Sequence, residues 1–316
     1  MTSNRCSTQQ KLDSTHTTIP IPFAPVTISD KAWLERIIRL EDSRSSAWCF
    51  GNMFFAMNAE VTALGDRLLM WFTFEGRSLY GFPIGGGDLK PAILALQADA
   101  QYRGVPLCIR GLTERSRLEM EAAFPGKFDY TPDPTVYDYI YEAEKLATLA
   151  GKKLHAKRNH INRFLEEHTD WVFEPITAEN LSECLAMSRE WAKERQELKD
   201  SASDLNALQL ACDNFEALGL EGGLLRVEGR VVAFTIGEPL NSDTYIVHFE
   251  KAFSSVQGAY PLVCREFVRH VLEVHPHIRY INREEDLGIE SLQRAKRSYY
   301  PVFMVEKYIA HWRDEV

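Results

Sequence analysis

The segment GGLLRVEGRVVAFTIGE, residues 222–238, decides the fold of this chain. Two apolar runs flank its centre, and Glu228-Gly229 between them is a turn signal of the kind that joins antiparallel strands. The segment therefore predicts a β-hairpin. Short apolar runs and helical patterns alternate after it, as expected for a sheet covered by helices. The elements expected here are strands at 244–250, 279–282 and 302–309 and helices at 260–274 and 289–297.

The first half of the chain shows the same order of elements. Its expected elements are strands at 60–64, 68–74, 78–82, 105–109 and 136–141 and helices at 91–102 and 114–123. Identity between the halves is negligible, so the expectation of an internal duplication rests on element order alone. We therefore expect a mixed α+β fold of two tandem units, each with a mixed β-sheet flanked by helices.

Three parts follow from this order. Residues 1–28 are rich in Ser, Thr, Gln and Pro and lack periodicity, which is typical of a mobile tail, so order should begin near Ser29. Residues 29–150 should form the first unit. Residues 151–316 should form the second unit, which carries the main motifs, with Gly151 as the hinge.

The composition is that of a folded protein with a sizeable core. Of 316 residues, 45% are apolar and 26% are charged. Acidic side chains outnumber basic ones by 45 to 36, which argues against a protein that coats nucleic acid. The six cysteines are scattered, and neither a signal peptide nor an apolar run long enough to span a bilayer is visible. We therefore expect a cytoplasmic protein without a transmembrane segment.

Several common catalytic motifs are absent from the sequence. It contains neither a Walker A motif nor a G-x-S-x-G elbow. His270, His275 and His277 are close in sequence, but Pro276 interrupts the helix and no cysteine or paired carboxylate stands at ligand spacing. We therefore expect no metal site.

A run of cations and amides follows Gly151. Helical spacing places Lys153, Lys157 and His160 on one face, opposite an apolar stripe. A solvated helix face is the alternative interpretation. Arg158 and Asn159 add planar donors, which suit phosphate or carboxylate recognition. All five side chains are therefore candidate ligands for an anionic donor.

The strand that follows the hairpin carries ionisable side chains. Alternation predicts that Ile246, His248 and Glu250 share one face, where a His and a Glu can form an acid/base pair. An ion pair with Lys251 is the structural alternative. Further on, Gly258 precedes a helix whose N-terminal N–H groups could hold a phosphate, or it simply makes the turn.

The segment 280–301 concentrates polar residues at a strand end, where open α/β sheets bind ligands. Its candidate site residues are Asn282, Glu284, Asp286, Lys296 and Tyr299. Helix capping is the alternative role for part of this set. Crowded carboxylates should raise the pKa of at least one of them, unless Lys251, Arg283 or Lys296 forms an ion pair there.

These segments together resemble the bacterial family that shares the C-terminal domain of phosphatidylglycerol lysyltransferases, which is related to Fem-type aminoacyl transferases. The resemblance rests on three motifs: KKLHAKRNHIN at 152–162, HFEKA at 248–252 and NREEDLGI at 282–289. It covers most of the chain from about residue 30 and implies tandem GNAT-like acyltransferase folds. Unlike the membrane lysyltransferases, this chain shows no transmembrane helices ahead of the domain, and of the GNAT acyl-CoA loop only QGA at 257–259 remains.

The resemblance implies transfer of an aminoacyl or acyl group to an amine or hydroxyl acceptor. Glu284 or Glu250 would act as the general base, and His248 would position it. Lys296, Tyr299 and backbone N–H groups would face the carbonyl oxygen or the donor, which could be acyl-CoA or aminoacyl-tRNA. Two other interpretations remain open: a non-catalytic GNAT-like protein that binds a nucleotide or small metabolite, and an acetyl-CoA-dependent N-acetyltransferase of small molecules.

Overall fold

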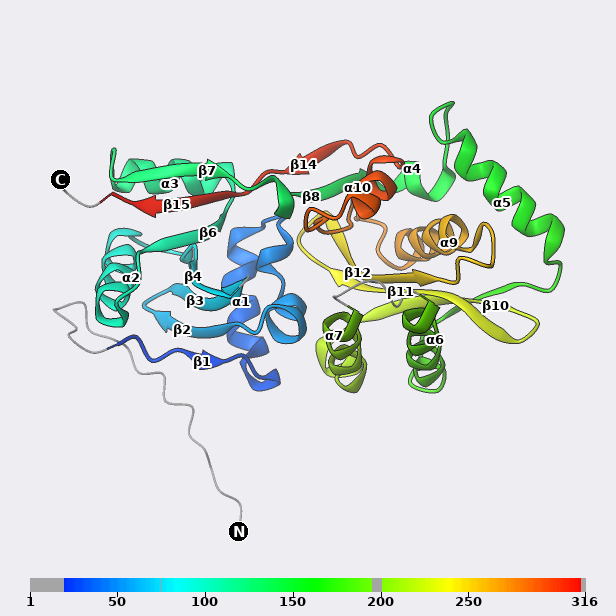
Figure 1. Cartoon of the computed structure of the whole chain (residues 1–316), viewed down its shortest axis with the longest axis horizontal. Helices are drawn as coiled ribbons and strands as arrows, with labels where there is room; N and C mark the ends of the chain where they lie inside the picture. The colour runs from blue at the N-terminus through cyan, green and yellow to red at the C-terminus, as the bar shows by residue number, and fades with distance from the viewer. Residues whose placement is uncertain (1–19, 75, 195–200, 314–316) are drawn as a thin grey trace, which may run out of the picture. The chain divides into compact units, whose positions relative to one another are not determined.

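The computed structural model describes residues 20–74, 76–194 and 201–313. The chain forms two compact units, each built around a mixed β-sheet with helices beside it (Figure 1). The units are interleaved in sequence. Among the described residues, the first unit comprises 20–41, 57–133 and 307–313, and the second comprises 42–56 and 134–306.

The first unit contains an eight-stranded sheet in the order β1-β2-β3-β4-β6-β15-β7, with β5 paired to β3. Its strands are β1 (Ala24–Pro25), β2 (Glu60–Leu64), β3 (Arg67–Phe74), β4 (Arg77–Gly81), β5 (Ile84–Gly85), β6 (Cys108–Leu112), β7 (Phe128–Pro132) and β15 (Tyr308–Trp312). Its helices are η1 (Ile28–Asp30), α1 (Lys31–Glu41), α2 (Lys90–Arg103) and α3 (Glu114–Ala123). β4 and β6 run parallel, and the other neighbours in the order are antiparallel.

The second unit contains a seven-stranded sheet in the order β14-β8-β13-β12-β11-β10-β9. Its strands are β8 (Asp138–Glu142), β9 (Val172–Pro175), β10 (Glu221–Val227), β11 (Arg230–Pro239), β12 (Thr244–Ala252), β13 (Tyr280–Asn282) and β14 (Phe303–Val305). Its helices are η2 (Ser46–Trp48), the π-helix η3 (Asn52–Ala56), η4 (Pro134–Val136), α4 (Ala143–Thr148), α5 (His155–Glu167), α6 (Leu181–Glu194), α7 (Ser201–Asp213), α8 (Phe215–Leu218), α9 (Ala259–Val274) and α10 (Glu290–Arg297). β12 and β13 form the parallel pair.

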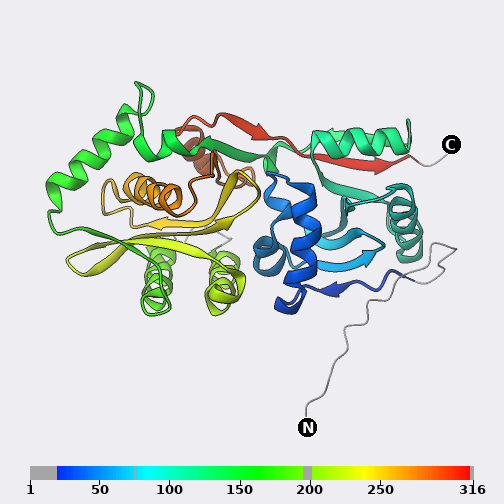
Figure 2. The same cartoon turned by 180° about the vertical axis from the view of Figure 1, so that it is seen from behind.

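Helices cover both faces of the second sheet. α9 packs on β10, β11 and β12 from one side, and α6 packs on β11 from the other side with α7 beside it (Figures 1 and 2). β11 is buried along almost its whole length for this reason. The predicted hairpin at 222–238 is confirmed as β10 and β11, and it forms the centre of this unit.

The two sheets have the same strand order. Reading the second sheet from β9 to β14 gives the same sequence of antiparallel and parallel pairs as reading the first from β1 to β7. Each sheet also contains a strand from the other half of the chain, since β15 lies between β6 and β7 and β8 lies between β13 and β14. The boundary expected between residues 150 and 151 therefore falls inside the second unit.

This exchange corrects two predicted strands. The run 302–309, expected as one strand, is divided into β14 in the second sheet and β15 in the first. The strand expected at 136–141 as the end of the first half is β8, which pairs in the second sheet, while β7 closes the first. An apolar run predicts extended backbone, but it does not specify which sheet supplies the hydrogen-bonding partner.

Order also begins earlier than expected. Residues 1–19 of the predicted tail lie outside the described part of the chain. Ile21 is buried and its N–H donates to Asp99 Oδ1 at 2.7 Å, and β1 pairs with β2 through Ala24 and Val61. Tertiary contacts thus fix residues 20–28 although they lack periodicity. Among the described residues, no helix has the length and apolar character needed to cross a membrane.

Candidate functional site

The candidate site lies where the parallel strands β12 and β13 separate. Their pairing ends at Ile246 and Asn282, and β12 continues to Ala252. Residues 283 and 284 stay bonded to β8 instead, because Arg283 N–H donates to Tyr139 O at 3.0 Å and Tyr139 N–H donates to Glu284 O at 3.2 Å. Two charged pairs bridge the resulting gap, and we call these four residues the β12–β13 junction: His248 with Glu284, and Glu250 with Arg283.

The first pair presents a carboxylate on an immobilised imidazole. His248 Nδ1 donates to Glu284 Oε1 at 2.8 Å, and Asn52 Nδ2 on η3 donates to the same oxygen at 2.9 Å. The Glu284 side chain retains 21% exposure, whereas His248 has 1%. Glu284 has a φ of 54°, and its N–H donates to Asn282 Oδ1 at 2.6 Å. The tight turn after β13 therefore aims the carboxylate back at His248.

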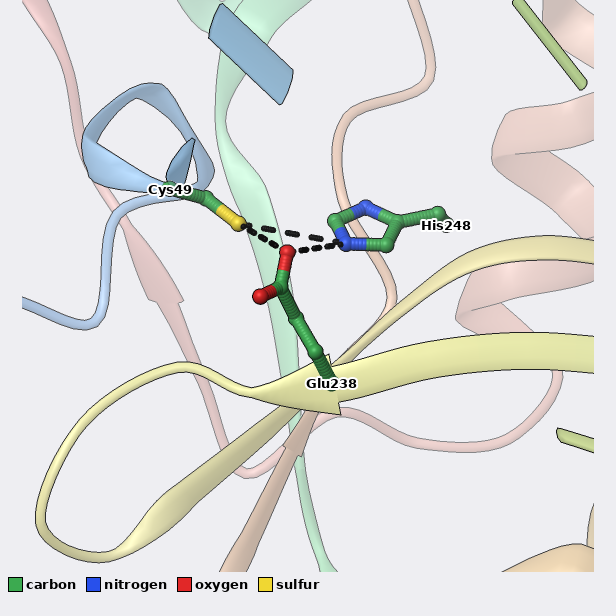
Figure 3. Close-up of side chains that lie close together, drawn as sticks. All are labelled: Cys49, Glu238 and His248. Atoms are coloured by element: carbon green, nitrogen blue, oxygen red, sulfur yellow. Dashed lines mark hydrogen bonds and ion pairs between the residues drawn. The ribbon is translucent and has the colours of Figure 1, made fainter. Parts of the chain in front are cut away.

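The other nitrogen of His248 faces two further buried groups (Figure 3). Nε2 lies 3.1 Å from Glu238 Oε1 and 3.8 Å from Cys49 Sγ, and the Cys49 thiol donates to Glu238 Oε1 at 2.9 Å. Burial and the Glu238 carboxylate raise the pKa of Cys49 to about 12. Burial disfavours charge on His248, but contact with Cys49 and hydrogen bonds to Glu238 and Glu284 outweigh it and hold its pKa well above the usual value.

The second pair is more deeply enclosed. Arg283 donates to Glu250 Oε1 at 2.7 Å, and its guanidinium lies 4.7 Å from the ring centre of Tyr299 and 5.7 Å from that of Tyr141. Burial opposes the charge of Arg283, but Glu250 outweighs it, so the pKa is raised. The second terminal nitrogen of Arg283 is buried without a hydrogen-bond partner among the described residues. A guanidinium with a free donor suits an anionic ligand.

His248 and Glu250 do not share a face, in contrast to the prediction. The β11–β12 ladder pairs Ile236 with Phe249 and then Gly237 with Val247, so a bulge at His248 breaks the alternation. His248 consequently points toward Cys49, while Glu250 lies against Cys264 on α9. Because of the bulge, His248 and Glu250 make separate polar contacts on different faces of the strand and do not form one acid/base pair.

Of the cations predicted on α5, Lys157 reaches the junction. Its Nζ lies 4.0 Å from the ring centre of Tyr299, which also stacks on Arg283. Burial and the neighbouring Arg283 lower the pKa of Lys157. Lys153 Nζ lies 5.2 Å from the ring centre of Tyr300, the residue that follows Tyr299. Lys157, Tyr299 and Arg283 therefore form a continuous basic and aromatic row beside Glu250.

The other predicted residues of this segment contact groups away from the junction. Arg158 donates to the backbone oxygens of Leu149 and Gly151, and thus caps the end of α4. Asn159 contacts His155 at 3.3 Å, and His160 lies 3.5 Å from Gln257. Of the cations expected to share a cleft with Asn282 and Glu284, Lys157 lies beside Tyr299, next to Arg283, and the shared cleft stays a prediction.

Gly258 is needed for close packing. A Cβ there would stand 2.3 Å from His160 O and 2.8 Å from Phe164 Cβ, and its φ is 90°. Gly258 therefore lets the loop before α9 pack against α5, which is the turn-forming alternative considered from the sequence.

Three predicted residues hold the turn after β13 in place. Asn282 Nδ2 donates to Arg44 O at 2.7 Å, and Asp286 accepts from the Tyr139 hydroxyl at 2.5 Å and from Gly288 N–H at 2.8 Å. Lys296 Nζ donates to the backbone oxygens of Arg283 and Glu285. Burial lowers the pKa of Lys296 to about 8. The carboxylates of this region also have separate partners. Arg283 forms an ion pair with Glu250, which is one of the pairings considered from the sequence.

Four residues of the site were not among the predicted site residues. Cys49 and Asn52 come from a segment without a recognisable pattern, and the structure brings them to His248 and Glu284 across 199 and 232 positions. Glu238 ends the apolar run of β11, and a carboxylate closing such a run is a usable signal. Arg283 had been considered only as a counter-ion. Spatial proximity of distant segments is the information that the sequence lacks.

The mixed α/β fold, with two mixed sheets flanked by helices, is similar to the folds of FemX and L-PGS. The crystal structure of FemX matches with a TM-score of 0.56 at 10% identity, over 93% of this chain and 98% of FemX. L-PGS from Bacillus licheniformis matches with a TM-score of 0.63 at 17% identity, over 94% of this chain and 95% of that chain. At these identities the likeness concerns the fold.

The chain belongs to the family of the phosphatidylglycerol lysyltransferase C-terminal domain, whose family model matches residues 38–311. This confirms the resemblance found in the sequence. A conserved protein of unknown function from Bacteroides thetaiotaomicron is 40% identical, with a TM-score of 0.86 over 93% of this chain and 100% of that chain. An uncharacterized protein of Mycoplasmoides gallisepticum is 24% identical over 176 residues, or 54% of this chain. The match spans about half, 55%, of the length of that curated relative.

Proposed function

We propose that this protein is an acyltransferase that moves an aminoacyl or acyl group to an amine or hydroxyl acceptor, with Glu284 as the general base. The observation that carries the proposal is the partly exposed Glu284 carboxylate, fixed by His248 and Asn52 where β12 and β13 separate. Family membership supports the same class of reaction.

The proposed step needs no covalent enzyme intermediate. Glu284 takes the proton from the acceptor amine or hydroxyl, whose nitrogen or oxygen attacks the carbonyl carbon of the donor ester or thioester. A new amide or ester bond forms, the ester or thioester bond of the donor breaks, and the tRNA oxygen or the CoA sulfur leaves with the proton that Glu284 took from the acceptor. His248 acts as a positioning residue, because it is buried and holds the carboxylate oxygen at 2.8 Å.

The donor would bind beside the second pair. Lys157, Tyr299 and Arg283 form the basic and aromatic row, and Arg283 has an unsatisfied donor there. Both aminoacyl-tRNA and acyl-CoA carry phosphates that such a row suits. The relatives named for lysylphosphatidylglycerol synthesis favour an aminoacyl donor, so tRNA is the donor carrier that we propose. Glu250 would hold Arg283 in place rather than act as the base, since the two form a buried ion pair.

The shared strand order of the two sheets supports a tandem duplication of one ancestral unit. Among the described residues the ionisable junction lies in the second unit, so we propose that this unit carries the chemistry. A non-catalytic protein that binds a nucleotide or metabolite in the second unit is the alternative, and the following experiment separates the two.

The test is transfer activity of the variant Glu284→Gln. Lysyl-tRNA, a mixture of other aminoacyl-tRNAs and acetyl-CoA serve as donors, and phosphatidylglycerol vesicles and small amines serve as acceptors. We expect Glu284→Gln to stay folded, to bind the active donor and to lose roughly 100-fold or more of the rate. The matched control is Glu290→Gln, because Glu290 is an exposed carboxylate on the neighbouring α10.

Full activity in folded Glu284→Gln would move the base to Glu250. Donor binding by the wild-type protein without transfer to any acceptor would favour the binding protein instead.

A further inference from the structure

We propose that Cys49, Glu238 and His248 form a binding site for a zinc ion. The three side chains each direct one ligand atom to a common point, and these atoms lie within 4.8 Å of one another (Figure 3). A thiolate, an imidazole and a carboxylate together are a ligand set that borderline-soft Zn²⁺ accepts in proteins. This site shares His248 with the proposed transfer chemistry, but the proposal rests on the placement of the three ligand atoms and not on that reaction.

The distances suit a small tetrahedral ion. The separations are 2.9 Å from Cys49 Sγ to Glu238 Oε1, 3.1 Å from His248 Nε2 to Glu238 Oε1, and 3.8 Å from Cys49 Sγ to His248 Nε2. Zinc bonds of about 2.0–2.3 Å require ligand atoms that stand roughly 3.3–3.7 Å apart in a tetrahedron. Side-chain movements of about half an ångström would complete this geometry.

The ligands come from fixed parts of the fold. Glu238 is on β11 and His248 on the paired strand β12, while Cys49 lies between η2 and η3. All three side chains are buried. The bulge in β12 is the feature that turns His248 toward Glu238. Ligands on paired strands need little rearrangement to bind an ion, and three protein ligands leave one position of a tetrahedral zinc ion for water.

The second ring nitrogen of His248, Nδ1, has the kind of partner that is common in metal sites. Nδ1 lies 2.8 Å from Glu284 Oε1, so a neutral His248 that donates Nδ1–H to this carboxylate would turn its Nε2 lone pair toward Cys49 and Glu238. Metal-bound histidines usually donate their second nitrogen to a carboxylate or carbonyl in this way. Glu284 therefore supports the ligand without being one.

The charges of the three ligands match those of a divalent ion. Thiolate, carboxylate and neutral imidazole would balance a divalent ion completely, and a water molecule would fill the fourth position.

The experiment measures metal content and the spectrum of the cobalt form of the full chain. The protein, without a histidine tag, is incubated with ZnSO₄, desalted and analysed by mass spectrometry of metals. We expect about one zinc per chain, and Co²⁺ should give the near-ultraviolet band of a cobalt–thiolate bond. Cys49→Ala should lower zinc affinity by about 100-fold or more and remove this band.

Cys108→Ala is the matched control, because Cys108 is also a buried cysteine but lies in the first unit. It should keep both the zinc and the band. If Cys49→Ala does not fold, Glu238→Gln provides the second variant, with the same expected loss of zinc. Glu284→Gln should weaken binding by roughly 10-fold.

Less than about one tenth of a zinc per folded chain, with no cobalt–thiolate band, would overturn the proposal. The three groups would then be a hydrogen-bonded cluster that needs no metal. Equal loss of the band in Cys108→Ala and Cys49→Ala would overturn it as well.

Discussion

Each sheet contains a parallel pair at the same place in its strand order, yet the two pairs differ in chemistry. In the first sheet β4 ends at Gly81, where its pairing with Arg110 of β6 also ends. Arg110 is neutralised there by Asp133 and stacks 3.6 Å from the ring centre of Phe74. In the second sheet β12 continues six residues beyond the last parallel pair, and the β12–β13 junction occupies the gap.

The difference shows that strand order alone does not create the site. Two local irregularities of the backbone create it: the bulge at His248 and the positive φ at Glu284. Both occur in the second sheet, at the elements that carry the junction. Backbone irregularities are common beside functional sites because they redirect side chains that a regular strand would bury or expose uniformly.

The largest effect should come from breaking a buried ion pair in each sheet. Glu250→Gln leaves Arg283 without its counter-ion, and Asp133→Asn does the same to Arg110. Each change should lower the free energy of unfolding by about 3–5 kcal/mol, because a buried charge is left uncompensated. Urea denaturation with hydrogen exchange resolved by unit measures both losses.

Donor binding distinguishes the two variants. Glu250→Gln should also weaken donor binding, since Arg283 loses its orientation, whereas Asp133→Asn should leave it unchanged below the unfolding transition. Equal effects of the two variants on donor binding would show that the β12–β13 junction has no special role in binding the donor.

The bulge can be tested through Gly237. A Cβ at this position would stand 2.0 Å from the backbone oxygen of Ile246, so Gly237→Ala must shift the ladder that forms the bulge. We expect a loss of about 3 kcal/mol in the free energy of unfolding and a displaced His248. Gly86→Ala is the control in the first unit, because a Cβ there meets only Asp66 Cβ at 3.9 Å. An unchanged transition midpoint in Gly237→Ala would contradict the strained contact.

Lys296 should give the junction a pH dependence. Its pKa is about 8 in the folded protein, against an ordinary lysine value of 10.5, because burial disfavours the charge. Between these values the unfolded state holds the proton and the folded state does not, so stability rises with pH. The free energy of unfolding of the wild type, relative to Lys296→Met, should increase by about 2 kcal/mol between about pH 7 and about pH 9.5. A flat difference over this range would be incompatible with the lowered pKa.

The smallest effect concerns the cations of α5 that lie away from the junction. Arg158→Ala removes donors to the backbone oxygens of Leu149 and Gly151 and should cost about 1 kcal/mol of stability. Arg163→Ala removes an exposed pair with Glu167 and should cost about 0.4 kcal/mol or less. Thermal unfolding of both variants checks the order. A reversed order would mean that Arg158 is not a cap.

Local sequence patterns predicted the regular elements well. The hairpin at 222–238 and the helices at 91–102, 114–123 and 260–274 match β10–β11, α2, α3 and α9 within one or two residues. Glycine turns, apolar periodicity and helix length determine such elements locally, so one sequence is sufficient. The family resemblance also predicted the fold, because the motif around Asn282 is specific.

Non-local choices were the ones that failed. The exchange of β8 and β15 depends on which strand edge competes best for pairing, and the bulge at His248 depends on the geometry of Gly237 and Ile246. Cys49 joins the site because residues 42–56 pack in the second unit. No periodicity in that segment predicts this packing. The sequence could therefore suggest His248 and Glu284 as site residues, but it could not show which groups surround them.

The strand exchange has a consequence for how the chain folds during synthesis. The first unit needs β15, which comes from residues 308–312, to fill the position between β6 and β7. Nascent chains usually fold their N-terminal part first, as it leaves the ribosome. Here the edges of β6 and β7 must wait until almost the entire described chain has been translated, and the second sheet, with all of its strands already available, can be completed before the first. A fragment cut after residue 150 would lack β15 while carrying an unpaired β8, so neither half is a unit of folding by itself.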